Sequence, residues 1–78
     1  MNWTEDAKRW KAISLGMSTS ELLETMQESV KLMRDYIRAD EPMSADYYYH
    51  KAMFYADRYG RQAGAEIKTS LAALASSI

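Results

Sequence analysis

An apolar heptad between Ser18 and Arg38 constrains the fold more than any other feature of this sequence. Its side chains recur at alternating spacings of three and four residues: Leu23, Met26, Val30, Met33 and Ile37. This period places them on one side of an α-helix and is incompatible with a β-strand. Ser18 and Glu21 add the S-x-x-E capping box that starts a helix. The pattern therefore predicts a helix over residues 19–38, whose apolar face is widened by Leu22, Leu32 and Tyr36.

A second, longer helix is predicted over residues 44–76. Apolar and small side chains mark one of its faces: Tyr49, Ala52, Ala56, Tyr59, Ala63, Ile67, Leu71, Leu74 and Ile78. At 1.5 Å per residue such a helix would be about 45–50 Å long. Gly60 and Gly64 lie inside it, and each costs about 1 kcal/mol relative to alanine in a helix interior. Either the helix breaks near Gly60 or close packing offsets that cost, and we favour close packing.

A short first helix is predicted over residues 4–14. Thr4 is the expected N-cap, because its hydroxyl can accept a hydrogen bond from an amide two or three residues later. One face of this helix is apolar: Trp3, Ala7, Trp10 and Ile13. We expect the tryptophans to pack the helix onto the rest of the chain, and the alternative is an exposed pair that binds a partner. Gly16 marks the end of this helix, and Pro42 lies in the second predicted loop, residues 38–44.

Together these segments predict an all-α fold in a single domain over residues 1–78, an antiparallel helical hairpin with a short N-terminal helix. A helix of about 20 residues cannot cover a partner of about 30 residues, so the far half of the last helix must meet another surface. Left exposed, its apolar side chains would favour aggregation. We therefore expect a homodimer or a higher helical bundle. The expected self-association residues are Ala52, Ala56, Gly60, Gly64, Ile67, Leu71 and Leu74.

Composition excludes several classes of protein. At 78 residues the chain buries only about 60% of its unfolded surface, so oligomerisation or tight helix packing must supplement the core. Zero cysteines exclude disulfides and thiolate metal ligands and fit a cytoplasmic location. A net charge of −1 disfavours both a basic DNA-binding protein and an acidic DNA mimic. No apolar run is long enough for a membrane span.

Residues with catalytic chemistry are few. His50 is the one histidine, and its spacing to the acidic residues matches no metal-binding motif. The carboxylates stand mostly at helix starts and in the second loop, and no P-loop or G-x-S-x-G motif occurs. We therefore expect no enzyme activity, no cofactor and no metal.

One polar pattern on the last helix remains as a candidate site. Aromatic and cationic side chains recur there at helical spacing, and we call this set the Tyr/Lys/Arg stripe: Tyr48, Lys51, Tyr55, Arg58, Arg61 and Gln62. Tyrosine rings can stack on a base while lysine and arginine hold phosphate. The same residue types also recognise proteins, or bury their rings between helices while the charged ends reach solvent. The sequence leaves these three interpretations open.

Two hypotheses for function follow from this pattern. The first is a non-catalytic protein-interaction module that self-associates and docks on a larger protein as an adaptor or inhibitor, a role common among small accessory and phage-encoded factors. The second is a nucleotide-binding or nucleic-acid-binding protein that uses the Tyr/Lys/Arg stripe.

Overall fold

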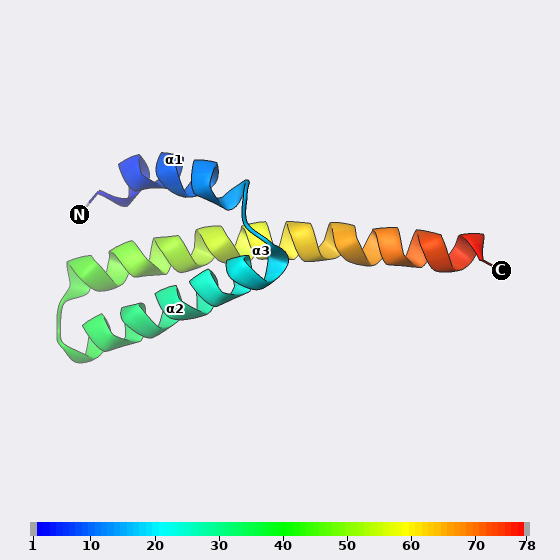
Figure 1. Cartoon of the computed structure of the whole chain (residues 1–78). Helices are drawn as coiled ribbons and strands as arrows, with labels where there is room; N and C mark the ends of the chain where they lie inside the picture. The colour runs from blue at the N-terminus through cyan, green and yellow to red at the C-terminus, as the bar shows by residue number, and fades with distance from the viewer. Residues whose placement is uncertain (1, 78) are drawn as a thin grey trace.

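A computed structural model of the chain describes residues 2–77 and consists of three helices (Figure 1). These are α1 (Trp3–Ser14), α2 (Thr19–Arg38) and α3 (Pro42–Ser76), and the described residues include no strand. Helices α2 and α3 pack along each other as an antiparallel hairpin, and α1 lies against another side of α3. The predicted all-helical architecture and the packing of the second helix on the third are therefore confirmed.

Local hydrogen bonds define both ends of α2. At its start the hydroxyl of Ser18 accepts from the amide of Glu21 at 3.2 Å, and the Glu21 carboxylate accepts from the amide of Ser18 at 3.0 Å. This is the predicted capping box. At its end Asp40 adopts a left-handed conformation with φ 56°, and the amide of Glu41 donates to the carbonyl of Tyr36 at 2.9 Å. That arrangement is a Schellman motif, in which a left-handed residue closes the helix.

The face of α2 that is buried differs from the predicted one. Leu22, expected only to widen the apolar stripe, is fully buried, while Ile37, expected in the seam, is 60% exposed. Ser29, one helical heptad after Leu22, is 2% exposed. Its hydroxyl donates to the carbonyl of Thr25 at 2.8 Å, so the serine satisfies its polar group within its own helix. The prediction used apolar residues only and therefore left out Ser29. For that reason, the predicted face is rotated around the α2 axis from the face that is buried.

Helix α1 begins earlier than predicted, because Asn2 and not Thr4 is its N-cap. The side-chain oxygen of Asn2 accepts from the amide of Thr4 at 3.1 Å, and the hydroxyl of Thr4 donates to the same oxygen. Trp3, Ala7 and Trp10 pack inward as expected. Ile13 does not, because it is 53% exposed on the outer side of the helix.

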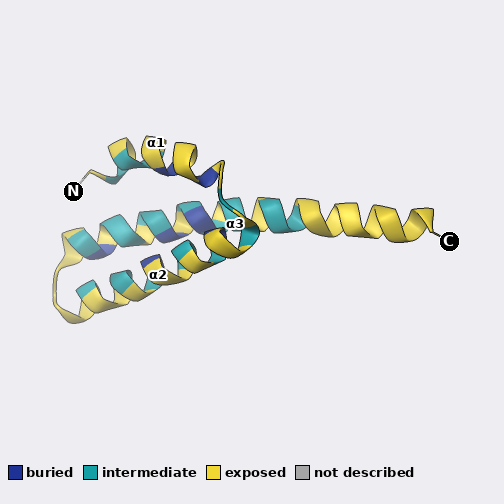
Figure 2. Cartoon of the chain, in the orientation of Figure 1, coloured by how far each residue is buried: buried dark blue, intermediate teal, exposed yellow. Residues whose placement is uncertain are grey.

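Helix α3 is 35 residues long and continuous through both of its glycines, and it starts with Pro42 at its first turn. Its length is about 52 Å, against about 30 Å for α2, so α2 covers only the first part of it. Every residue from Ala65 to Ser77 is exposed, and the end of α3 projects from the body in Figure 2. The close packing expected at Gly60 and Gly64 is absent within the described chain, because a Cβ at either position would meet no atom of another helix within 4 Å.

The core lies where all three helices meet. Each helix contributes one buried side chain to it, Trp10 from α1, Leu22 from α2 and Tyr55 from α3. Partly buried side chains surround this centre: Trp3, Ala7, Met17, Met26, Tyr47, Phe54 and Tyr59. The core is therefore small and sits within the first part of α3, far from its C-terminal end.

Candidate functional site

The aromatic rings of the Tyr/Lys/Arg stripe lie inside the helix assembly. Tyr55 is 2% exposed in the core, and burial raises the pKa of its phenol. Tyr48 stacks on Tyr36 of α2 with ring centroids 5.5 Å apart and an angle of 6° between the rings. Tyr55 is thus enclosed and presents no face on which a base could stack, while Tyr48 is half-buried with one face against Tyr36.

Gln62, at the end of the stripe, connects α3 to the start of α2. Its side-chain amide donates to the carbonyl of Met17 at 3.3 Å and to the hydroxyl of Thr19 at 3.1 Å. That hydroxyl in turn donates to the carboxylate of Glu66. Gln62 therefore holds the connection between α1 and α2 against α3, a role that sequence spacing alone did not reveal.

The cations of the stripe do not converge on one point. Arg61 is exposed and pairs with Asp57 of its own helix at 3.0 Å. Lys51 and Arg58 are half-buried, and the Nε of Arg58 has no hydrogen-bond partner among the described residues. With Tyr55 buried, Tyr48 stacked on Tyr36 and Gln62 engaged, much of the stripe packs between helices.

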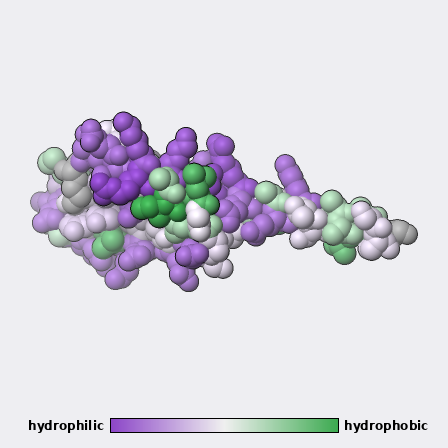
Figure 3. Space-filling view, turned by 45° about the horizontal axis from the view of Figure 1, so that its top comes forward, coloured by the Kyte–Doolittle hydropathy of each residue, from purple (hydrophilic) through white to green (hydrophobic). Residues whose placement is uncertain are grey.

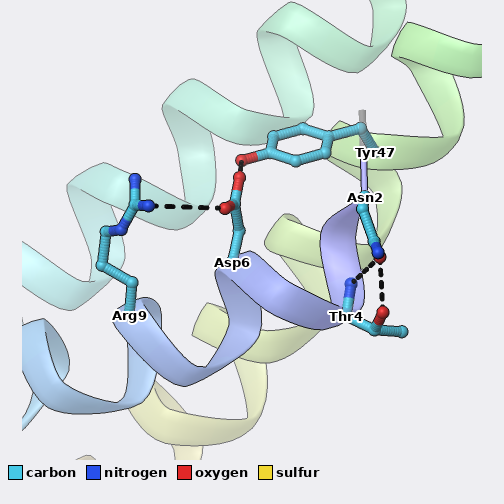
Figure 4. A network of polar contacts seen from close by, with 5 residues as sticks. All are labelled: Asn2, Thr4, Asp6, Arg9 and Tyr47. Atoms are coloured by element: carbon cyan, nitrogen blue, oxygen red, sulfur yellow. Dashed lines mark hydrogen bonds and ion pairs between the residues drawn. The ribbon is translucent and has the colours of Figure 1, made fainter.

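Polar contacts around Asp6 (Figure 4) and the stacking of Trp3 on His50 attach α1 to α3. The phenol of Tyr47 donates to the carboxylate of Asp6, which also lies 3.8 Å from the guanidinium of Arg9. Burial, with the nearby Asp6 carboxylate, raises the pKa of Tyr47 to about 12. Trp3 stacks on His50 at a centroid distance of 3.9 Å. The aromatic side chains of α1 are therefore anchors within the chain.

The lowered pKa of Glu21 and the contacts of His50 have structural explanations. Glu21 has a lowered pKa because its carboxylate accepts the backbone and side-chain hydrogen bonds of the Ser18 cap. His50 lies 3.3 Å from Asp46 and against Trp3. Across residues 2–77, no group of three or more histidine and acidic side chains is placed to hold a metal ion. In the same part of the chain, no helix has both the length and the apolarity needed to cross a membrane.

A different face of α3 carries most of the exposed apolar side chains of this helix. We call it the outer stripe, and its members are Tyr49, Met53, Ala56, Gly60, Gly64, Ile67, Leu71 and Leu74. Tyr49 is 46% exposed, Met53 56%, Ile67 59%, Leu71 59% and Leu74 62%. At 100° per residue the outer stripe lies about a quarter turn around α3 from the residues that pack on α2. Its C-terminal part forms the apolar surface of the projecting end in Figure 3.

The predicted self-association residues divide between two faces. Ala52 is 8% exposed and belongs to the interior of the hairpin. The other six lie on the outer stripe, where Ala56 and Gly64 are half-buried and Gly60 is exposed. Tyr49 and Met53 extend the exposed face back toward the start of α3, and Met53 was not among the residues expected on that face. A spacing of four from Tyr49 would have included it.

The fold and its surfaces define a small three-helix protein with one long, partly uncovered helix. Comparison with known proteins adds no family to that description, since the chain matches no protein-family model, no curated protein and no solved structure.

Proposed function

We propose that this chain is a non-catalytic protein-interaction module, which self-associates and docks on a larger protein as an adaptor or inhibitor. The observation that supports this proposal is the open apolar face at the end of α3. Ile67, Leu71 and Leu74 are each about three-fifths exposed, at 59%, 59% and 62%, on a segment that lies beyond the core.

Two physical arguments favour a protein partner over solvent for this segment. Large contiguous apolar patches on monomeric proteins usually mark interaction sites. In addition, an isolated helix of about 12 residues is marginal in water, so most helical stability comes from packing of an apolar face. A protein partner would supply that packing for residues 65–77.

The polar groups of the chain favour binding over catalysis. The side chains with shifted pKa values, Glu21, Tyr47 and Tyr55, are engaged in a helix cap, a helix–helix hydrogen bond and the core. Of the tyrosine rings that a nucleotide would need, Tyr55 is buried in the core and Tyr48 already stacks on Tyr36. The protein-interaction role is therefore the better supported of the two hypotheses.

The test is capture of proteins from the source organism's lysate on the immobilised full-length chain. The informative variant is Leu71→Glu, which places a charge on the apolar face, and the matched control is Ala65→Glu, an exposed position on another side of α3. We expect the parent and the control to retain the same protein and Leu71→Glu to retain about tenfold less, the typical effect of a hot-spot residue.

Two results would contradict the docking role. One is equal retention by Leu71→Glu and Ala65→Glu, because the apolar face would then not be the contact surface. The other is retention of nothing except further copies of the same chain. Helical content of each variant is checked by circular dichroism, so that loss of capture is not confused with unfolding.

A further inference from the structure

We infer that the outer stripe of α3 is the face on which a second copy of this chain lies, with the two α3 helices antiparallel about a twofold axis and crossing between Gly60 and Gly64. This inference rests on the self-association in the proposed function and specifies its geometry. It makes each copy's projecting helix end lie along the hairpin of the other, so a larger partner that binds Leu71 would compete with the second copy for this face.

The order of side-chain sizes along the outer stripe supports the crossing point. Large side chains stand at both ends, Tyr49 and Met53 at one and Ile67, Leu71 and Leu74 at the other, with Ala56, Gly60 and Gly64 between them. Small residues at a crossing let two helix backbones approach closely, and the steps of three and four residues along the stripe keep the two helices side by side at the shallow angle of about 20° typical of coiled coils. The open space around both glycines leaves room for such an approach, because a Cβ added at either position would have no atom within 4 Å apart from its neighbours along the chain and the nearby backbone of α3.

Two antiparallel copies of the stripe match each other when they are centred between Gly60 and Gly64. With the twofold axis between Gly60 and Gly64, Met53 of one copy faces Leu71 of the other, and Tyr49 faces Leu74. Each large end is then covered by the large end of the partner copy. Such a contact uses the same patch on both copies and closes at two subunits.

The charges beside the stripe favour the antiparallel direction. Asp57 and Lys68 are about three helical turns apart and therefore border the stripe on the same side. In an antiparallel twofold pair, residues on the same side of the stripe face each other, so Asp57 of each copy meets Lys68 of its partner. Asp57 would then stand between that lysine and Arg61 of its own chain, to which it already pairs.

The length of α3 gives a second argument for this direction. The exposed segment beyond α2 and the stretch of outer stripe beside α2 are of similar length, on either side of Gly60 and Gly64. In the antiparallel pair the projecting end of one copy therefore covers Tyr49 and Met53 of the other. In a parallel pair the two projecting ends would pack on each other, and neither would contact a hairpin.

Engineered disulfides test this geometry, and the absence of natural cysteine makes the background clean. A Met53→Cys chain is mixed with a Leu71→Cys chain and oxidised, and covalent dimers are identified by mass. We expect the mixed disulfide to dominate, since the two positions are opposite. Either chain alone should give almost none, because the two copies of either position would be about 27 Å apart.

A charge exchange provides an independent measurement on the unlinked protein. Asp57→Lys alone and Lys68→Asp alone each place like charges across the contact twice, so each should weaken dimerisation about tenfold. Mixing the two variants pairs opposite charges again at both places. The mixture should therefore form dimers with close to the parent affinity, measured by sedimentation at several concentrations.

The outcomes separate the two proposals. A parent chain that sediments as a monomer at tens of micromolar overturns self-association itself. A parent dimer whose Met53→Cys variant cross-links to itself overturns the antiparallel direction only, as does a dimer in which the mixed disulfide fails to form. A trimer or larger closed species would overturn the twofold pair.

Discussion

The phenol of Tyr47 on α3 donates a hydrogen bond to the carboxylate of Asp6 on α1, and this contact joins two helices that are far apart in sequence. This hydrogen bond adds to the attachment that Trp3 and Trp10 of α1 make to the rest of the chain. Replacing Tyr47 by phenylalanine keeps the ring and removes only this bond. We expect the free energy of unfolding to fall by about 1.5–3 kcal/mol, the range for hydrogen bonds to charged groups.

The same residue predicts a pH dependence of stability. The pKa of Tyr47 is about 12 in the folded chain, above the ordinary tyrosine value of 10.0. Between these values the unfolded chain has lost the proton and the folded chain keeps it, so stability is full below pH 10 and declines as pH rises toward 12. Urea unfolding measured across this window should show a shallower decline in Tyr47→Phe. An identical decline in both proteins would contradict the assignment.

The capping box of α2 predicts a coupling between Ser18 and Glu21. Hydrogen bonds from Ser18 lower the pKa of the Glu21 carboxyl, so its contribution to stability is present above the unfolded pKa and is lost as pH falls through the folded value. Ser18→Ala keeps the backbone hydrogen bond, the larger cause, and removes the side-chain one, so it should raise the Glu21 pKa part of the way toward 4.5 in an NMR titration. The exposed neighbour Ser20 provides a control, because Ser20→Ala removes a hydroxyl outside the box and should leave that pKa unchanged.

The left-handed conformation of Asp40 at the end of α2 predicts that glycine at this position stabilises the protein. Asp40 has φ 56°, a conformation that side chains disfavour and glycine adopts freely. We expect Asp40→Gly to raise the free energy of unfolding by about 0.5–1 kcal/mol, and Asp40→Ala to lower it. Urea denaturation of the three proteins would show this order. A less stable glycine variant would mean that the Asp40 side chain contributes more than its backbone conformation costs.

The rotated face of α2 predicts unequal effects of two similar truncations. Leu22 is fully buried, so Leu22→Ala should cost about 2–5 kcal/mol. Ile37 is 60% exposed, so Ile37→Ala should cost less than about 1 kcal/mol. Thermal or urea unfolding of both variants measures the difference. Equal losses of unfolding free energy in the two variants would instead support the buried face that the apolar heptad predicts.

Gly60 predicts effects of opposite sign on helix stability and on assembly. A Cβ at this position would meet no atom within 4 Å beyond the adjoining backbone of α3, and alanine favours a helix by about 1 kcal/mol over glycine. Gly60→Ala should therefore stabilise the helix while it weakens dimerisation, since the crossing has less room. Gly60→Glu should abolish dimerisation. Circular dichroism of dilute protein reports the first effect and sedimentation the second, and unchanged sedimentation of Gly60→Glu would place the contact elsewhere.

Much of the helical structure could be predicted from local chemistry. The capping box at Ser18, the apolar period after it and the continuous last helix all depend on residues a few positions apart. The expected Thr4 cap was wrong for a reason of the same local kind, since Asn2 is also a good N-cap and lies two residues earlier. Such signals are read along one helix and need no knowledge of its neighbours.

The sequence by itself determined the class of fold, the number of helices and the excess length of the last one, because helical period, caps and length are properties of a single segment. The tertiary structure decided which side of each helix is covered. It placed Ser29 in the interior and Ile37 outside, and it enclosed Tyr55 while Met53, two residues earlier on the same helix, stayed in solvent. The physical reason is that burial depends on how each helix is rotated about its axis relative to its neighbours. That rotation is set by the packing of all three helices together, so the residue spacing within one helix does not reveal it.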